Sequence, residues 1–379
     1  MRIGFLFNHD ALHQVAHTAP VMAELAKAGV HVSALLSSPE QDTRLRELLP
    51  DSTEVHFIAL PVKWPVRTVD IVARRFAPFR RIAVLWENRA VLAGFDALIV
   101  SETTSALLKS RFGAPGLKLI YIPHGAGDRS VGYRQVTRSF DLVLLSGRKV
   151  RNRMMAQGLI TPESHAIVGY PKFDTVNLAH VPRIFDNDRP TVLYNPHFDP
   201  LLSSWYDMGT AVLDWFAAQD RFNLVFAPHV MLFKRRLHAS VEHRRTRVRY
   251  GVPRRFHGLP HIRIDTGSTS STDMTYTRAA DIYLGDASSQ VYEWVLRPRP
   301  CVFLNAPGVL WQGDPNYLHW TLGEVIEKVA ALPEALARAK ADFATFYERQ
   351  ILAREETFAL SDISASRRAA SAILAFLQP

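Results

Sequence analysis

Short apolar runs alternate with segments of helical periodicity along most of the chain. In the first half, such runs fall at residues 3–7, 30–36, 55–60, 97–100, 117–122, 142–145 and 166–168. In the second half they fall at residues 191–194, 224–227, 262–264, 282–284 and 301–304. Strands that are separated by helices form parallel sheets, because each helix carries the chain back to the same end of the sheet. The pattern therefore predicts an α/β protein.

The alternation lapses between residues 176 and 190, which have the composition of a linker. This segment divides a first unit, residues 1–175, from a second unit, residues 191–320. A chain of 379 residues exceeds the size at which one core stops growing, so two units are expected. Residues 321–379 have a helical pattern, and we expect these helices to cross back to the first unit. The predicted architecture is two Rossmann-like, doubly wound units that face a cleft, with ligands at the carboxyl ends of the strands.

Composition and charge limit the cellular compartment and the classes of partner that are expected. The first residues turn polar too soon for a signal peptide, no apolar run approaches the length of a membrane span, and Cys301 is the single cysteine. We therefore expect a cytoplasmic protein. The net charge is +9, which favours a location at the inner face of an anionic membrane or contact with a polyanion. Basic residues cluster at Arg74–Arg75, Arg80–Arg81, 234–236 and 243–255. No nucleic-acid-binding motif accompanies them, so nucleic acid is not an expected partner.

The clearest candidate for a ligand site follows the run at 282–284. Asp286, Ser288 and Ser289 stand where a helix would begin, and free N–H groups at such a position bind phosphate. Glu293 lies one turn further along the predicted helix, where a carboxylate could accept hydrogen bonds from ribose hydroxyls. The alternative is that the two serines only cap the helix and that Glu293 is solvated.

Polar residues also follow several other predicted strands. All of them would lie at the carboxyl ends of parallel strands, where α/β proteins bind ligands. These residues are His9, His124, Gly169, Pro171, His197 and His229. His9, His13 and His17 repeat every four residues, but no carboxylate with ligand spacing accompanies them, so we expect no metal.

The ordered combination of these motifs resembles the CDP-glycerol glycerophosphotransferase family, which builds teichoic acids and related capsules. The residues that carry the resemblance are His124-Gly125, Gly169-Tyr170-Pro171 with Asp174, His229, and Ala280-Asp281-Ile282 leading to Asp286, Ser288 and Ser289. The sequence departs from the family after His124-Gly125, where Ala126-Gly127-Asp128-Arg129 replaces the usual Thr-Pro-Leu-Lys. It also has Ala287 where the family has tyrosine.

The resemblance implies a GT-B fold and a transferase that moves glycerol phosphate, or another phosphopolyol, from a CDP-linked donor to a hydroxyl of a lipid-linked or polymeric acceptor. It implies that His124 is the general base, that His229 stabilises the diphosphate, and that Ser288 with Ser289 binds phosphate. We expect Asp286, Glu293, Gly169, Pro171 and His197 to complete the donor site. We expect His9, Asp128 and Arg129 to contact the acceptor, and no cofactor beyond the donor.

Two other functions fit the same residues. A GT-B glycosyltransferase or a UDP-sugar 2-epimerase could use the serines and Glu293 for a UDP-sugar in the same way. A protein that only binds polyanions or a membrane surface could keep the fold without catalysis. The nucleotide that is released, and the effect of removing His124, distinguish these alternatives.

Overall fold

The computed structural model describes residues 1–9, 11–51, 53–63, 79–240 and 243–378. The basic pair Arg74–Arg75 lies outside these residues. The chain divides into two compact units. Unit 1 comprises residues 1–126, 131–177 and 355–379, and unit 2 comprises residues 127–130 and 178–354.

Unit 1 is built on a seven-stranded sheet with the order β3-β2-β1-β4-β5-β6-β7, in which every neighbouring pair is parallel. All seven strands that the apolar runs predict are present, as expected of a parallel sheet whose inner strands are covered on both faces. The strands are β1 (Arg2–Phe7), β2 (His31–Leu36), β3 (His56–Ala59), β4 (Ala97–Val100), β5 (Lys118–Tyr121), β6 (Leu142–Leu145) and β7 (His165–Ile167).

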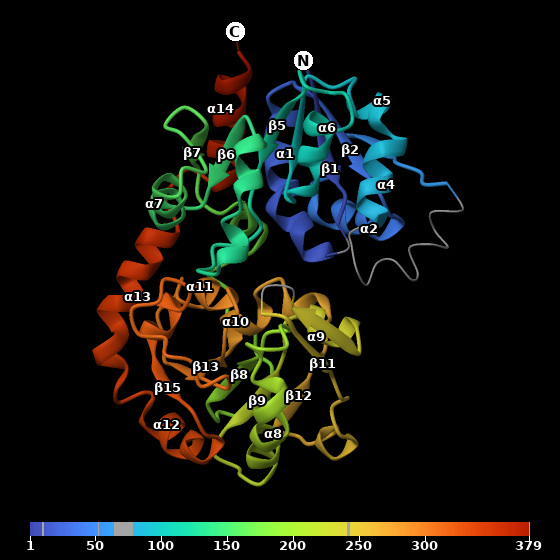
Figure 1. Ribbon diagram of the computed structural model, residues 1–379. Helices are drawn as coiled ribbons and strands as arrows, with labels where there is room; N and C mark the ends of the chain where they lie inside the picture. The colour runs from blue at the N-terminus through green and yellow to red at the C-terminus, as the bar shows by residue number, and fades with distance from the viewer. Residues whose placement is uncertain (10, 52, 64–78, 241–242, 379) are drawn as a thin grey trace. The chain divides into compact units, whose positions relative to one another are not determined.

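Successive residues of the unit 1 strands pack on opposite faces of the sheet. Ile3, Phe5 and Phe7 belong to one core cluster, whereas Leu6 belongs to another. The first cluster includes residues of the C-terminal helix α14 (Ala365–Leu377), which packs beside α1 (Ala19–Lys27) (Figure 1). Among the described residues, the other α-helices of unit 1 are α2 (Pro39–Leu48), α4 (Phe79–Glu87), α5 (Arg89–Leu92), α6 (Leu107–Ser110) and α7 (Arg148–Ala156).

Unit 2 contains a six-stranded parallel sheet with the order β12-β9-β8-β13-β14-β15. Five strands match the predicted runs, and one corrects the prediction: residues 324–326 form the edge strand β15 in a region expected to be helical. The strands are β8 (Thr191–Asn195), β9 (Asn223–Phe226), β12 (Ile262–Ile264), β13 (Ile282–Gly285), β14 (Cys301–Leu304) and β15 (Glu324–Ile326).

A two-stranded antiparallel hairpin, β10 (Leu237–Ser240) with β11 (Arg245–Val248), stands apart from the large sheet of unit 2. It was not predicted, because neither strand is a run of apolar residues: β10 is Leu-His-Ala-Ser and β11 is Arg-Thr-Arg-Val. The helices of unit 2 are α8 (Thr210–Ala217), α9 (Met231–Lys234), α10 (Thr275–Ala279), α11 (Gln290–Trp294) and α12 (Leu332–Arg338), and α13 (Phe343–Thr357) leads from unit 2 into unit 1. A π-helical turn, Trp205–Gly209, precedes α8.

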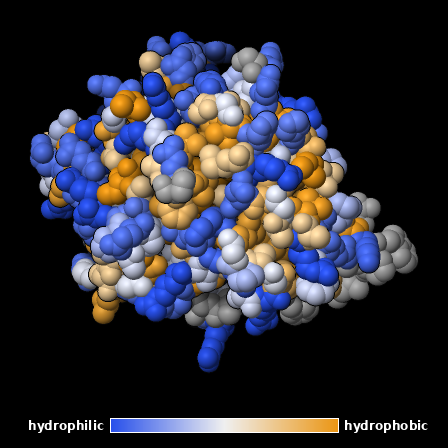
Figure 2. Space-filling model, turned by 90° about the horizontal axis from the view of Figure 1, so that it is seen from above, coloured by the Kyte–Doolittle hydropathy of each residue, from blue (hydrophilic) through white to orange (hydrophobic). Residues whose placement is uncertain are grey.

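Residues 176–190 contain neither helix nor strand. Among the described residues, no helix combines the length and the apolarity that a bilayer crossing demands. Figure 2 shows a face on which hydrophobic residues gather near the middle, with hydrophilic residues around them. Some apolar exposure is usual, since polar atoms cannot cover a whole protein surface.

Candidate active site

Both sheets reverse their strand order at a point where polar residues collect. In unit 1, the order reverses between β1 and β4, and in unit 2 it reverses between β8 and β13. Helices on either side of such a point diverge and leave the strand ends accessible to ligands. His9 follows β1, Ser101 follows β4, His197 follows β8 and Asp286 follows β13.

Asp286 organises the switch point of unit 2. Its Oδ1 accepts a hydrogen bond from the backbone N–H of His197 at 2.8 Å, and its Oδ2 accepts from the N–H and hydroxyl of Ser204 at 2.7 and 2.8 Å. Burial raises the pKa of this carboxyl, and the bonds from Ser204 and His197 oppose that rise. Because both oxygens are used by the protein itself, Asp286 positions the loop after β8 relative to the turn after β13.

His197 and His229 present ring N–H groups of fixed orientation. Nδ1 of His197 accepts the backbone N–H of Asp199 at 3.1 Å, and Nδ1 of His229 accepts the N–H of Met231 at 3.2 Å. The neutral tautomer that satisfies each bond carries its proton on Nε2. Burial, and then His229 and Arg129, lower the pKa of His197 well below its ordinary value. The two rings lie 5.3 Å apart between centroids, so the two N–H donors belong to neighbouring side chains.

The two serines occupy different environments. Ser288 is buried and its hydroxyl accepts the N–H of Gln290, whereas Ser289 is exposed. Helix α11 that follows has five residues, so its dipole is small and phosphate affinity must come from individual N–H and O–H groups. Gly127 approaches this turn so closely that a Cβ added to it would lie 2.8 Å from Cβ of Ser289.

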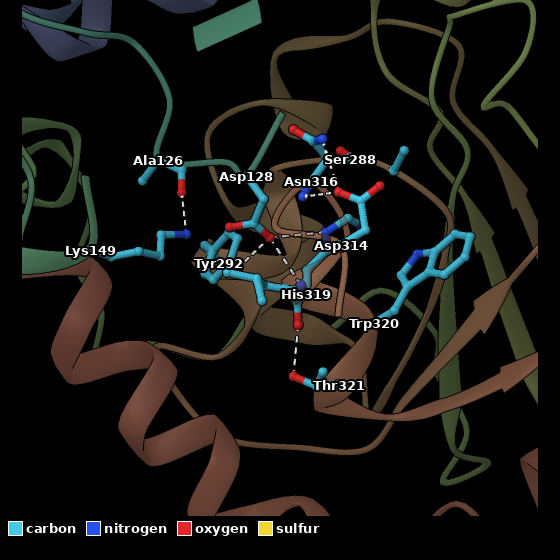
Figure 3. A network of polar contacts seen from close by, with 12 residues as sticks. Ala126, Asp128, Lys149, Ser288, Tyr292, Asp314, Asn316, His319, Trp320 and Thr321 are labelled. Atoms are coloured by element: carbon cyan, nitrogen blue, oxygen red, sulfur yellow. Dashed lines mark hydrogen bonds and ion pairs between the residues drawn. The ribbon is translucent and has the colours of Figure 1, made fainter. Parts of the chain in front are cut away.

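Asp128 anchors a buried network that the sequence did not reveal (Figure 3). Its Oδ2 accepts hydrogen bonds from the Tyr292 hydroxyl at 2.6 Å, from the backbone N–H of His319 at 2.9 Å and from Nδ1 of the same ring at 3.1 Å. Nε2 of His319 and the indole N–H of Trp320 both reach the carbonyl oxygen of Asp286, at 3.0 and 2.7 Å. This network fixes the backbone just before the two serines. His319 follows no strand, so its position in the sequence gave no signal.

Arg129 supplies positive charge to unit 2. A guanidinium nitrogen lies 3.9 Å from a carboxylate oxygen of Asp199, and both side chains are largely buried. The other carboxylate oxygen of Asp199 accepts the N–H groups of Leu201 and Leu202. Arg129 therefore lies in the same unit as the serines and the histidine donors.

Glu293 is buried at the wall of a cavity of about 140 Å³. The lining also includes Leu178, Val181, Met274, Thr277, Arg278, Leu296, Arg297 and Arg299. Burial lowers the pKa of Arg299 to about 9, and its guanidinium lies over the Trp294 ring at 3.6 Å from the centroid. Glu293 thus faces a recess that is basic and apolar rather than open solvent.

In unit 1, His124 has the opposite tautomer to the pair in unit 2. Its Nδ1 lies 2.9 Å from the carbonyl oxygen of Ser101, an acceptor only, so Nδ1 carries the proton and Nε2 keeps a lone pair. Burial lowers the pKa of His124, and the bond to Ser101 partly offsets that shift. His124 is therefore a neutral base at physiological pH.

Further histidines surround His124. The His13 ring lies 6.4 Å from the His124 ring, and within the described residues neither ring nitrogen of His9 has a hydrogen-bond partner. Burial, and then His124 and Arg81, lower the pKa of His9 to about 3. Among the described residues, no group of three His, Cys, Asp or Glu side chains has metal-site geometry.

Gly169 and Pro171 also lie in unit 1. Gly169 has a φ of +88°, which favours glycine. An added Cβ would meet Arg368 and the carbonyl oxygen of Ala359 at 2.5 and 2.9 Å. Pro171 is buried at the start of a 3₁₀ turn, Pro171–Thr175. Packing against the C-terminal segment thus accounts for the glycine, and the structure does not place these two residues in the unit that holds Ser288 and Ser289.

No protein-family model and no curated protein matches this chain. Its structure does match solved structures over almost its whole length. The wall teichoic acid polymerase TagF, solved after a soak with CDPG, matches with a TM-score of 0.64 at 12% identity, covering 99% of this chain and 88% of TagF. A putative UDP-N-acetylglucosamine 2-epimerase from Listeria monocytogenes matches with 0.60 at 15% identity, covering 99% and 96%.

The calicheamicin glycosyltransferase CalG4 matches with a TM-score of 0.56 at 14% identity, covering 99% of this chain and 98% of CalG4. The fold is GT-B. Identities this low show the fold alone, so the chemistry of the GT-B protein described here has to be argued from its own residues.

Proposed function

We propose that this GT-B protein transfers a phosphopolyol, glycerol phosphate from CDP-glycerol, to a hydroxyl of a lipid-linked or polymeric cell-envelope acceptor and releases CMP. The observation that carries the proposal is the pair of opposite histidine tautomers. Unit 1 presents a lone pair on Nε2 of His124, and unit 2 presents N–H donors on Nε2 of His197 and His229. Acid and base functions of this kind serve the transfer of a charged group to a hydroxyl.

The donor site of the proposal lies at the switch point of unit 2. Diphosphate oxygens would accept hydrogen bonds from Nε2 of His197 and His229, from the Ser289 hydroxyl and from the backbone N–H groups of Ser288 and Ser289. Arg129 would offset the negative charge, as cationic and N–H groups do for transferring phosphates. Glu293, in its recess, would accept hydrogen bonds from the ribose.

In the reaction, the acceptor oxygen forms a bond to the phosphorus that carries the polyol, and the bond from that phosphorus to the CMP oxygen breaks. The acceptor proton passes to Nε2 of His124. The charge that develops on CMP is met by the same N–H donors that bind the diphosphate, which is why they would act more strongly in the transition state. His9, Asp128 and Arg129 were predicted to contact the acceptor; Asp128 is instead proposed to position the serine turn.

A second candidate is a UDP-sugar glycosyltransferase or 2-epimerase. The fold matches with an epimerase and a glycosyltransferase favour it, and the histidine donors would bind UDP equally well. We propose a cytoplasmic location, peripheral to the inner face of the membrane, which the net charge of +9 supports.

A donor panel tests the proposal. CDP-glycerol, CDP-ribitol, UDP-N-acetylglucosamine and CMP would each be titrated while the melting temperature is followed, because a ligand stabilises the folded state in proportion to the logarithm of its concentration over Kd. We expect the CDP compounds to stabilise most, and CMP to be the product released. Preferential stabilisation by the UDP-sugar, with UDP release or epimerisation, would replace the proposal by the second candidate.

Ser289→Ala should raise the Kd for CDP-glycerol about tenfold, because a hydrogen bond to a charged group contributes about 1.5 kcal/mol or more. The melting temperature should not change, since this side chain is exposed. Ser361→Ala, another exposed serine, is the matched control. Calorimetric titration measures both. An unchanged Kd in Ser289→Ala, and in the double variant with Ser288→Ala, would remove the serines from the donor site.

The pH dependence of transfer should reflect the lowered pKa of His124. Protonation removes the base, so activity falls as the pH drops through this pKa. Because burial lowers the pKa, the acidic limb of kcat/KM should have its midpoint below about 6.5, the value of an ordinary histidine. A midpoint above that value would contradict the assignment of this limb to His124.

A further inference from the structure

The β10–β11 hairpin of unit 2 has one face packed on the protein and one face exposed. Residues alternate between the faces because side chains along a strand point to opposite sides. The cross-strand pair His238 and Arg247 lies on the inner face. Nε2 of His238 contacts the carbonyl oxygens of Leu232 and Arg235 at 2.9 and 3.0 Å, and Arg247 makes a two-pronged ion pair with Asp207.

The outer face of the hairpin consists of Leu237, Ala239, Thr246 and Val248. All four are exposed, and Leu237 lies directly opposite Val248 in the register. Leu237 is 51% exposed and Val248 58% exposed. An isolated two-stranded hairpin has little stability of its own. The contacts of the inner face hold the strands in place, so the residues of the outer face are not needed to hold the hairpin against the protein.

Positive charge surrounds this apolar face. Lys234, Arg235 and Arg236 precede β10, Arg244 precedes β11 and Arg245 is its first residue; all of them are exposed. Tyr250, 53% exposed, follows β11, and its hydroxyl donates to the carbonyl oxygen of Tyr206 at 2.9 Å. Asp207 and Asp214 pair with Arg247 and Arg255, and among the described residues no carboxylate forms an ion pair with Arg244 or Arg245. The hairpin is therefore apolar at its outer face and cationic at both ends.

We propose that the β10–β11 hairpin is a membrane-docking element, whose outer face enters the interfacial region of an anionic bilayer while its arginines bind lipid headgroups. Apolar area and positive charge together match a bilayer surface, which offers both an apolar layer and anionic headgroups. A soluble polyanion would match the arginines but would leave Leu237 and Val248 in water. The proposal goes beyond the transfer reaction and holds whichever donor the site takes.

Flotation of the full-length protein with phosphatidylcholine vesicles, with and without phosphatidylglycerol, tests the proposal. Binding should require the anionic lipid and should weaken as salt rises. Arg244→Gln with Arg245→Gln should weaken binding about thirtyfold, since each cation near an anionic surface contributes about fivefold. Lys328→Gln with Lys340→Gln removes the same charge from exposed positions elsewhere in unit 2 and should have little effect.

Leu237→Ser with Val248→Ser should weaken vesicle binding about tenfold or more through lost apolar burial, whereas Leu310→Ser, at a position 94% exposed, should not. Thermal melting verifies that each variant is folded. Three outcomes would overturn the proposal. The first is that neither hairpin variant changes vesicle binding. The second is that the protein binds soluble polyphosphate as well as vesicles, and that both depend only on the arginines. The third is that the protein does not bind vesicles but self-associates through Leu237 and Val248.

Discussion

Replacement of His124 by alanine should reduce the rate of transfer by about 10²- to 10⁴-fold, the usual contribution of a general base. The Kd for the nucleotide donor should hardly change, because the donor groups that we propose lie in unit 2. His229→Ala should instead weaken donor binding and also reduce turnover, since an N–H donor to the diphosphate acts in the ground state and more strongly as the leaving group gains charge.

Steady-state kinetics with donor calorimetry measures this contrast, and His31→Ala, at an exposed position in unit 1, is the control. Rates within a few-fold of the unaltered protein in His124→Ala would exclude the residue as the base. An equal loss of donor affinity in His124→Ala and His229→Ala would assign both rings to the phosphates.

Asp128→Ala should lower the free energy of unfolding by about 1–3 kcal/mol or more, because it removes the acceptor of several buried donors and each buried group left unsatisfied costs about that much. The carboxylate is buried, and its loss removes the acceptor that the Tyr292 hydroxyl, Nδ1 of His319 and the His319 backbone N–H share. Because this network holds the turn before Ser288 and Ser289, donor affinity should fall as well.

The matched control is Asp188→Ala, which removes an exposed carboxylate 3.7 Å from Arg183. Exposed ion pairs contribute about 0–1 kcal/mol, so denaturant titration should show little change. Asp128→Asn keeps one acceptor oxygen and should cost less than alanine. If Asp128→Ala were as stable as Asp188→Ala, the network would not be what holds the turn.

The inner strands of the two parallel sheets could be predicted because they are buried on both faces and therefore appear as continuous apolar runs, whereas the edge strands β3, β7 and β12 are partly exposed. β4 and β12 coincide with the runs at 97–100 and 262–264. β15 was taken for helix because its three residues, Glu324-Val325-Ile326, lie in a region with helical composition. The hairpin strands were not predicted because they lack an apolar pattern. Polar contacts of His238 and Arg247 hold them against the rest of unit 2.

The candidate site divides in the same way. Position after a strand was the reason for choosing His124, His197 and His229, and the structure places each of them after a strand of its own unit. Position in the sequence could not reveal that both carboxylate oxygens of Asp286 accept hydrogen bonds from the loop after β8. It also could not reveal that Asp128 is hydrogen-bonded to a histidine far along the chain. Such contacts depend on tertiary structure, which local periodicity does not encode.

The assignment of residues 127–130 to unit 2 has a consequence for synthesis of the protein. Asp128 and His319 are separated by 191 positions. At a translation rate of about 5–20 residues per second, His319 is synthesised about 10–40 s after Asp128. During that interval unit 1 can form most of its sheet, but the loop after β5 has nothing to close on. Residues 178–354 expressed alone would lack Asp128, which belongs to their unit. A single cut in the chain therefore cannot yield the two units as separate proteins.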